Sequence, residues 1–178
     1  VILHKNDGRA GTAFDFRGTR SFLSEIERRP ETKNLMVFLD TLDAIVSLRV
    51  DPRKAALHLS EQEQRRLKVD GANYASWYRY LTQESPEILA PLWQSLKQII
   101  PGFQSMKLAS AAGTDKELII VVSTAGATYE VAYHELSDGQ RCLIILYTLV
   151  YALPKKGLLF LDEPEIHVAL AEVQPWLV

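Results

Sequence analysis

Two adjacent acidic residues, Asp162 and Glu163, directly follow an uninterrupted apolar run at residues 158–161 (LLFL). Such a run is typical of a short strand that is buried on both faces of a parallel sheet, and Pro164 ends it. Ligands of parallel α/β sheets gather at the carboxyl ends of the strands. Phosphoryl transfer depends on positioning and charge neutralisation, for which two neighbouring carboxylates with distinct roles are suited. A pair of solvated loop acids is the simpler alternative.

A second candidate lies upstream, where residues 136–141 (LSDGQR) open a long apolar helical pattern over residues 142–153. Ser137 is a good N-cap, which places residues 138–140 in the first helical turn. Free backbone N–H groups and the positive end of the helix suit a phosphate. Gly139 would let that phosphate approach the backbone closely. An ordinary capped helix is the alternative, but it does not predict the strand that follows.

Taken in order, LSDGQ, the apolar helix, the break at residues 154–157 and LLFLDEP resemble the head of an ABC-type ATPase. LSDGQ is similar to the signature LSGGQ, and LLFLDEP is similar to a Walker B strand. The continuation through Glu165, Ile166 and His167 resembles the SMC/RecF/OLD-like branch, which acts on DNA or in anti-phage defence. The resemblance implies an α/β P-loop NTPase fold: an antiparallel β subsheet, a helical subdomain and part of a parallel core sheet.

The resemblance also implies roles for individual residues, with ATP and Mg²⁺ as cofactors. Asp162 would hold Mg²⁺ through a water molecule, because Mg²⁺ retains several of its waters. Glu163 would be the catalytic residue that orients and polarises the attacking water. His167 would contact nucleotide or the dimer interface, although a structural histidine is an equal alternative.

In ABC-type ATPases the signature acts in trans, on ATP held by the P-loop of another subunit. By resemblance, Ser137, Gly139 and Gln140 would bind that nucleotide. Asp138 replaces the usual glycine, and because a carboxylate repels phosphate we expect its side chain to point away from the nucleotide. Arg141 either contacts nucleotide or, as we favour, pairs with an acid.

No P-loop motif G-x-x-x-x-G-K-[ST] occurs in the sequence. We therefore expect residues 1–178 to be a partial ATPase head whose P-loop lobe lies upstream in the same protein. Residues 1–133 would form the helical and antiparallel β region, and residues 134–178 the signature, the Walker B strand and the following segment. Efficient hydrolysis would then require the full-length protein.

The expected function is ATP hydrolysis by a homodimer, or a higher homo-oligomer, that closes around the nucleotides and drives DNA repair or anti-phage defence. A nuclease or other effector is the expected partner, and nucleic acid is a further candidate. The alternative is a nucleotide-gated assembly module with little or no hydrolysis. Tyr74, Trp77, Tyr78 and Tyr80 could stack on single-stranded nucleic acid, but aromatic residues at helical spacing more often form a core.

Composition sets the remaining limits. The net charge of −2 excludes a strongly basic nucleic-acid platform, and no apolar run reaches membrane-spanning length. The single cysteine, Cys142, fits a reducing cytoplasm and a buried position on the apolar helix. His4, His58 and His134 form no metal-binding pattern with it, so no zinc site is expected.

The periodicity predicts the elements that position these residues. Residues 1–5 and 12–16 are expected to form a hairpin, and residues 60–67 a solvated helix or a loop. Ser85 should cap a helix that begins at Pro86. The other expected elements are helices at residues 21–29, 34–44 and 74–81, and strands at residues 45–50, 103–109, 117–123 and 128–133.

Overall fold

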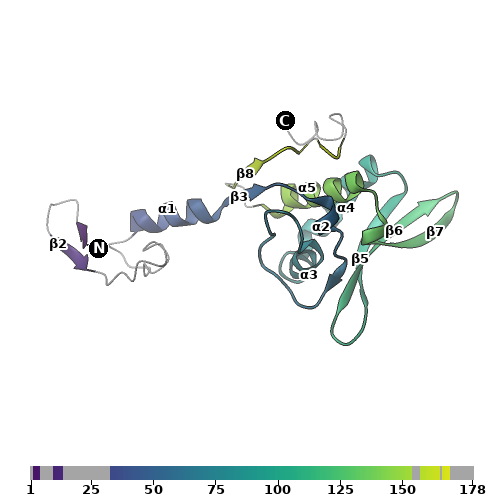
Figure 1. Cartoon of the computed structure of the whole chain (residues 1–178), viewed down its shortest axis with the longest axis horizontal. Coiled ribbons are helices and arrows are strands. Elements are labelled where there is room, and N and C mark those ends of the chain that lie inside the picture. The colour runs from purple at the N-terminus through teal and green to yellow at the C-terminus, as the bar shows by residue number, and fades with distance from the viewer. Residues whose placement is uncertain (1, 5–9, 14–32, 154–156, 165, 169–178) are drawn as a thin grey trace. The chain divides into compact units, whose positions relative to one another are not determined.

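The computed structural model describes residues 2–4, 10–13, 33–153, 157–164 and 166–168 (Figure 1). The chain divides into two units, residues 1–44 and 45–178. The first contains an antiparallel pair, β1 (Ile2–His4) and β2 (Ala10–Ala13), and helix α1 (Lys33–Asp43). The hairpin is confirmed, although its second strand begins at Ala10 and residues 14–16 of the predicted strand 12–16 lie outside the described residues. The helix expected at residues 34–44 is confirmed, whereas the helix expected at residues 21–29 lies outside the described residues.

The second unit is mixed α/β, and its parallel pair joins β3 (Ile45–Leu48) to β8 (Leu158–Leu161). Both strands were predicted from the sequence. The prediction that β8 is buried on both faces is wrong for the described part of the chain. Leu159 and Leu161 pack against the core, but Leu158 and Phe160 are 51% and 54% exposed. Among the described residues β8 pairs only with β3, and nothing covers its second face.

The antiparallel sheet contains the predicted meander of β5 (Phe103–Ser110), β6 (Lys116–Thr124) and β7 (Ala127–Ala132). The sequence did not indicate β4 (Leu59–Ser60), which pairs antiparallel with β6. β4 lies opposite residues 116–117 and β7 opposite residues 119–124, so these two strands share one edge of β6. The chain before β4 and the chain after β7 therefore meet beside the same part of β6.

Helices complete the second unit: α2 (Pro52–Ala55), α3 (Tyr74–Glu84), α4 (Leu89–Ile99) and α5 (Asp138–Ala152), with 3₁₀ turns η3 (Pro86–Ile88) and η4 (Tyr133–Glu135). Ser85 takes the predicted N-cap position before Pro86, but its side chain makes no capping hydrogen bond. Ser85 is also the C-cap of α3, since its backbone N–H donates to Leu81 O at 3.0 Å. Pro86 then opens a 3₁₀ turn rather than an α-helix.

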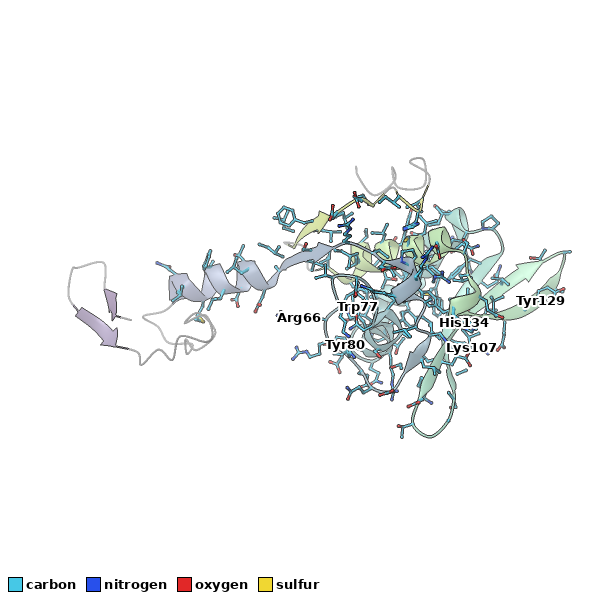
Figure 2. All side chains as sticks on the ribbon, in the orientation of Figure 1. Arg66, Trp77, Tyr80, Lys107, Tyr129 and His134 are labelled. Atoms are coloured by element: carbon cyan, nitrogen blue, oxygen red, sulfur yellow. The ribbon has the colours of Figure 1, made fainter. Side chains whose placement is uncertain are left out.

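The core lies where α3, α4 and the sheet enclose α5 (Figure 1). Tyr74, Trp77 and Tyr78 of α3 are buried there, and the Tyr74 hydroxyl lies 2.8 Å from Thr148 Oγ1 on α5. Figure 2 marks Trp77 and Tyr80 on this helix. The core interpretation of the aromatic residues is thus confirmed, and the three buried rings offer no stacking surface.

Residues 61–73 contain no helix or strand. Of the two alternatives predicted for residues 60–67, the loop is therefore confirmed. None of the helices that the structure describes is long and apolar enough to cross a membrane.

Candidate functional site

The two predicted acids lie where β8 ends and the chain turns. The backbone N–H of Asp162 donates to Leu48 O at 2.9 Å, which extends the pairing with β3 by one residue. Glu163 then adopts a positive φ of 53°. A non-glycine residue rarely takes this conformation, which costs of the order of 1 kcal/mol and is often found at functional sites. The turn redirects the chain immediately after the two carboxylates.

Arg49 is part of this site, although no sequence motif pointed to it. It follows β3 directly, and the parallel pairing of β3 with β8 places it beside the two acids. Its guanidinium donates to Glu163 Oε2 at 2.7 Å and lies 3.6 Å from Asp162 Oδ2. The three side chains are 64%, 45% and 61% exposed, so water and ions can reach all of them. The structure therefore pairs the two carboxylates with one cation of the chain itself.

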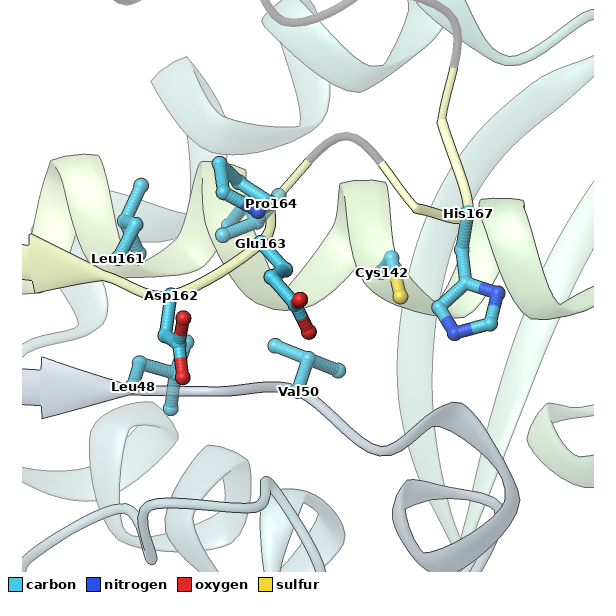
Figure 3. Close-up of a pocket in the computed structure, with 9 residues that line it drawn as sticks. Leu48, Val50, Cys142, Leu161, Asp162, Glu163, Pro164 and His167 are labelled. Carbon is cyan, nitrogen blue, oxygen red and sulfur yellow. The ribbon is translucent and has the colours of Figure 1, made fainter.

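Asp162, Glu163 and His167 line one open cavity of about 450 Å³. A smaller cavity of about 10 Å³ adjoins it and is also lined by these three residues (Figure 3). Figure 3 shows both carboxylates pointing toward the segment that continues from β3, where Val50 lies. Mg²⁺ prefers oxygen ligands such as carboxylates. The exposed carboxylates on this open cavity are therefore suitable ligands for the predicted Mg²⁺ ion. The remaining residues of the larger cavity are Arg49, Val50, Asp51, Pro52, Lys54, Val69, Asp70 and Ile166.

The LSDGQ segment (residues 136–140) forms the capped helix start that its sequence predicts. Ser137 is the N-cap of α5, and its Oγ accepts a hydrogen bond from Gln140 N at 3.3 Å. The Gln140 side chain returns the contact, since its Oε1 accepts from Ser137 N at 3.0 Å. This capping box satisfies two backbone donors. The side chains of Ser137 and Gln140 thus hold the helix start in the present structure, and their contact with nucleotide stays a prediction.

Asp138 is held by Arg141 one turn further along the helix. The Arg141 Nη2 group donates to Asp138 Oδ1, and Nη1 donates to His134 O at 2.8 Å and to Leu136 O at 2.6 Å. Arg141 is buried, so these acceptors replace the water that its charge loses. The expected pairing of Arg141 with an acid is confirmed.

Gly139 joins the helix start to the segment that follows the acids. A Cβ atom built on Gly139 would lie 2.5 Å from His167 O, closer than real Cβ contacts allow. The sequence explained this glycine by the approach of a phosphate. The structure adds a contact inside the chain, because only a residue without a side chain lets the His167 carbonyl come so near.

Cys142 follows on the buried face of α5 and is a free thiol. Loss of solvation by burial, with a smaller contribution from the Asp138 carboxylate, raises the pKa of the Cys142 thiol to about 11. The residue is therefore a protonated core side chain at neutral pH, as predicted, and not a nucleophile.

The structure also places His58 and His134 side by side, with ring centroids 4.1 Å apart. No sequence pattern linked the two histidines, because 75 residues lie between them and only the pairing of β4 and β7 with the same edge of β6 brings them together.

Comparison with protein families gives one match, which covers residues 41–168. The matching family model is described as "AAA domain, putative AbiEii toxin, Type IV TA system". Comparisons with curated proteins and with solved structures gave no match. The matched range includes β3, the LSDGQ segment, β8 and the two acids that follow it.

Proposed function

The chain belongs to this family of AAA domains, and from that premise we propose that it is the part of an SMC/RecF/OLD-like ATPase head that hydrolyses ATP bound between two subunits. The family indicates a nucleotide-binding ATPase domain. The sandwich arrangement and the process that it drives are the additional steps of the proposal. The observation that supports it most is the placement of Asp162 and Glu163 at the carboxyl end of β8, on an open cavity.

Each carboxylate has a distinct task in this reaction. Asp162 would hold Mg²⁺, which would supply charge neutralisation at the phosphates. Glu163 accepts a hydrogen bond from the attacking water and positions it. Arg49 has to release both carboxylates before they can do so, because its guanidinium lies 2.7 Å from Glu163 and 3.6 Å from Asp162.

The start of α5 supplies the second half of the proposed site. Its positive end and the Ser137 hydroxyl face a γ-phosphate held on the P-loop of a partner subunit. Two copies of the protein would thus close around two nucleotides. His167 links the two parts, since its side chain lines the cavity of the acids and its carbonyl contacts Gly139.

The process that uses this cycle is proposed to be DNA-linked, in repair or anti-phage defence, with a nuclease or another effector as partner. Support comes from the sequence Glu165-Ile166-His167 after the acids, which resembles the SMC/RecF/OLD-like branch. The description of the family, with its reference to toxin–antitoxin systems, is in line with a defence role.

ATP turnover and oligomeric state of the full-length protein test this proposal, with Glu163→Gln as the variant. Loss of a catalytic base typically slows a reaction by about 10²–10⁴-fold, so turnover should fall by that factor while ATP and Mg²⁺ still bind. Size-exclusion chromatography should then show a trapped ATP-dependent dimer. The matched control is Glu130→Gln, which removes a different exposed carboxylate from an ion pair, that with Lys107. Equal turnover of the two variants would refute the catalytic assignment.

A nucleotide-gated assembly module is the second candidate. It is favoured by the carboxylate of Asp138 in the LSDGQ segment and by the ion pair that holds Glu163. It predicts that wild-type protein and Glu163→Gln both dimerise with ATP and that neither turns it over. A protein that neither hydrolyses ATP nor changes size with it excludes both candidates.

A further inference from the structure

Three potential ligand side chains converge at the edge of β6, away from the cavity of the acids. His58 precedes β4, Glu117 lies in β6, and His134 lies in the turn η4 that follows β7. Each offers a nitrogen or oxygen atom, and these atoms all lie within 4.8 Å of one another. The Nε2 atom of His58 is 3.5 Å from Glu117 Oε1.

Strand register explains why these residues meet. Leu59 of β4 pairs with Glu117, and Leu118 N donates to His58 O at 2.8 Å. On the same edge, Ala132 of β7 pairs with Ile119. β7 ends at Ala132, and the turn η4 (Tyr133–Glu135) that follows it carries His134. Backbone pairing thus positions Glu117 and the residue after His58, and the end of β7 on the same edge brings His134 close to them; Figure 2 marks His134 beside the sheet.

The ligand types and their separations fit a tetrahedral transition-metal ion. Bonds of about 2.0–2.1 Å from zinc to histidine nitrogen and carboxylate oxygen place two tetrahedral ligands about 3.3–3.4 Å apart. The observed separation of 3.5 Å between His58 Nε2 and Glu117 Oε1 is close to this value. The other separations are within 4.8 Å and would have to shorten on binding.

A simple ion pair does not account for the whole arrangement. The pair of His58 with Glu117 involves only one of the two neighbouring rings and leaves His134 without a role. A metal ion instead binds neutral imidazoles together with an ionised carboxylate, so both rings can serve as ligands. Two histidines and one carboxylate are also a known ligand set of zinc and non-haem iron sites, in which at least one position stays open.

We propose that His58, Glu117 and His134 bind a divalent transition-metal ion of the zinc class, with a fourth position open to water or an external ligand. Nitrogen ligands favour such an ion over Mg²⁺ or Ca²⁺. The half-buried side chains of His58 and Glu117 and the exposed His134 leave room for the fourth ligand.

The site is connected to the LSDGQ segment through the backbone of His134. His134 O accepts the hydrogen bond from Arg141 Nη1 at 2.8 Å, and Arg141 in turn pairs with Asp138. A bound ion would tie the turn that leads into α5 to β4 and β6. This metal site is distinct from the proposed Mg²⁺ position, and the proposal does not depend on ATP hydrolysis.

Metal binding to the full-length protein, stripped with a chelator and studied without nucleotide, tests the proposal. We expect one equivalent of Zn²⁺ by calorimetry, and one equivalent of Co²⁺ with visible absorption bands of a four- or five-coordinate site. Because losing an outer-shell partner alone weakens metal binding about 10–100-fold, His58→Ala and His134→Ala should each weaken it by at least about 100-fold. Mg²⁺ in excess should not compete.

Two further variants make the result decisive. Glu117→Gln keeps the size of the side chain and should weaken Zn²⁺ binding, while His4→Ala removes a histidine from the first unit and should not. Circular dichroism confirms that each variant is folded, and His58→Asn or His134→Asn replaces the alanine variant at the same position if that variant is not folded. Binding below one equivalent, or binding that is unchanged in folded His58 and His134 variants, would overturn the proposal. Either result leaves the ATPase proposal unaffected.

Discussion

Arg49→Ala is expected to lower the Mg²⁺ concentration needed for ATP turnover. The guanidinium of Arg49 lies 2.7 Å from Glu163 and 3.6 Å from Asp162, so its positive charge lies beside the two carboxylates proposed to hold the metal ion and the attacking water. In wild-type protein the ion therefore competes with an internal cation. Without Arg49 that competition is absent.

The structure sets the size of the effect. Coulomb's law in water gives about 1.5 kcal/mol for unit charges at the shorter distance and about 1.2 kcal/mol at the longer one. Screening and side-chain entropy reduce exposed pairs to about 0.2–1 kcal/mol each, and all three side chains here are at least 45% exposed. Asp162 is the carboxylate proposed to hold the ion, so the competing pair contributes about 0.2–1 kcal/mol, which corresponds to a factor of about 1.4 to 5 in Mg²⁺ affinity.

Initial rates of ATP hydrolysis over a range of Mg²⁺ concentrations measure this factor, with Arg49→Lys as the control that keeps the charge. The half-saturating Mg²⁺ concentration should fall in Arg49→Ala and stay near the wild-type value in Arg49→Lys. The difference should shrink at high ionic strength because salt screens exposed charges. An unchanged half-saturating concentration combined with a loss of turnover would refute the reasoning, because Arg49 would then act on the nucleotide and not on the carboxylates.

Three further substitutions test the packing around the site. Gly139→Ala places a Cβ atom 2.5 Å from His167 O, so the segment after the acids must shift. ATP turnover should therefore fall, and unchanged turnover would contradict this prediction. Tyr74→Phe removes the buried hydrogen bond to Thr148 and should lower the free energy of unfolding by about 0.5–1.5 kcal/mol in denaturant titrations; no change would mean that this bond is not stabilising. For Asp70, the hydrogen bond from the Ala72 N–H, followed by the nearby Lys54 ammonium, lowers the pKa of the carboxyl. The ionised Asp70 carboxylate therefore stabilises the folded protein above the carboxyl's pKa in the unfolded chain, which is about 4. This stabilisation is lost as the pH falls through the lower pKa that the carboxyl has in the folded protein. Asp70→Asn should therefore lower the melting temperature at neutral pH but not near pH 2, and a pH-independent difference would contradict this cause.

Elements with a strong local pattern were predictable from the sequence. The start of α5 follows from a capping serine before a long apolar helix, and β8 from an apolar run that ends in two acids. The antiparallel meander was predictable because turn residues separate three extended runs. In each case the information lies within a few neighbouring residues.

The features that the sequence did not reveal depend on pairing between distant segments. Arg49 meets Glu163 only because β3 and β8 are parallel neighbours. β4 has two residues, too few for a periodic signal, and forms only against β6. The meeting of His58 and His134 follows from that pairing. The apolar run of β8 correctly indicated a strand, but its pattern could not show that one face remains exposed.

Asp138 shows how a departure from a family motif can be compensated locally. A carboxylate at a site meant for phosphate would repel the ligand if its charge were free. Here the buried guanidinium of Arg141 binds it through Nη2, while two backbone carbonyls accept hydrogen bonds from Nη1. A buried arginine needs such a partner, and an acid in the first helical turn is also stabilised by the helix dipole. Asp138 and Arg141 therefore form a nearly neutral pair, and the acid in place of glycine does not by itself count against a phosphate at the start of α5.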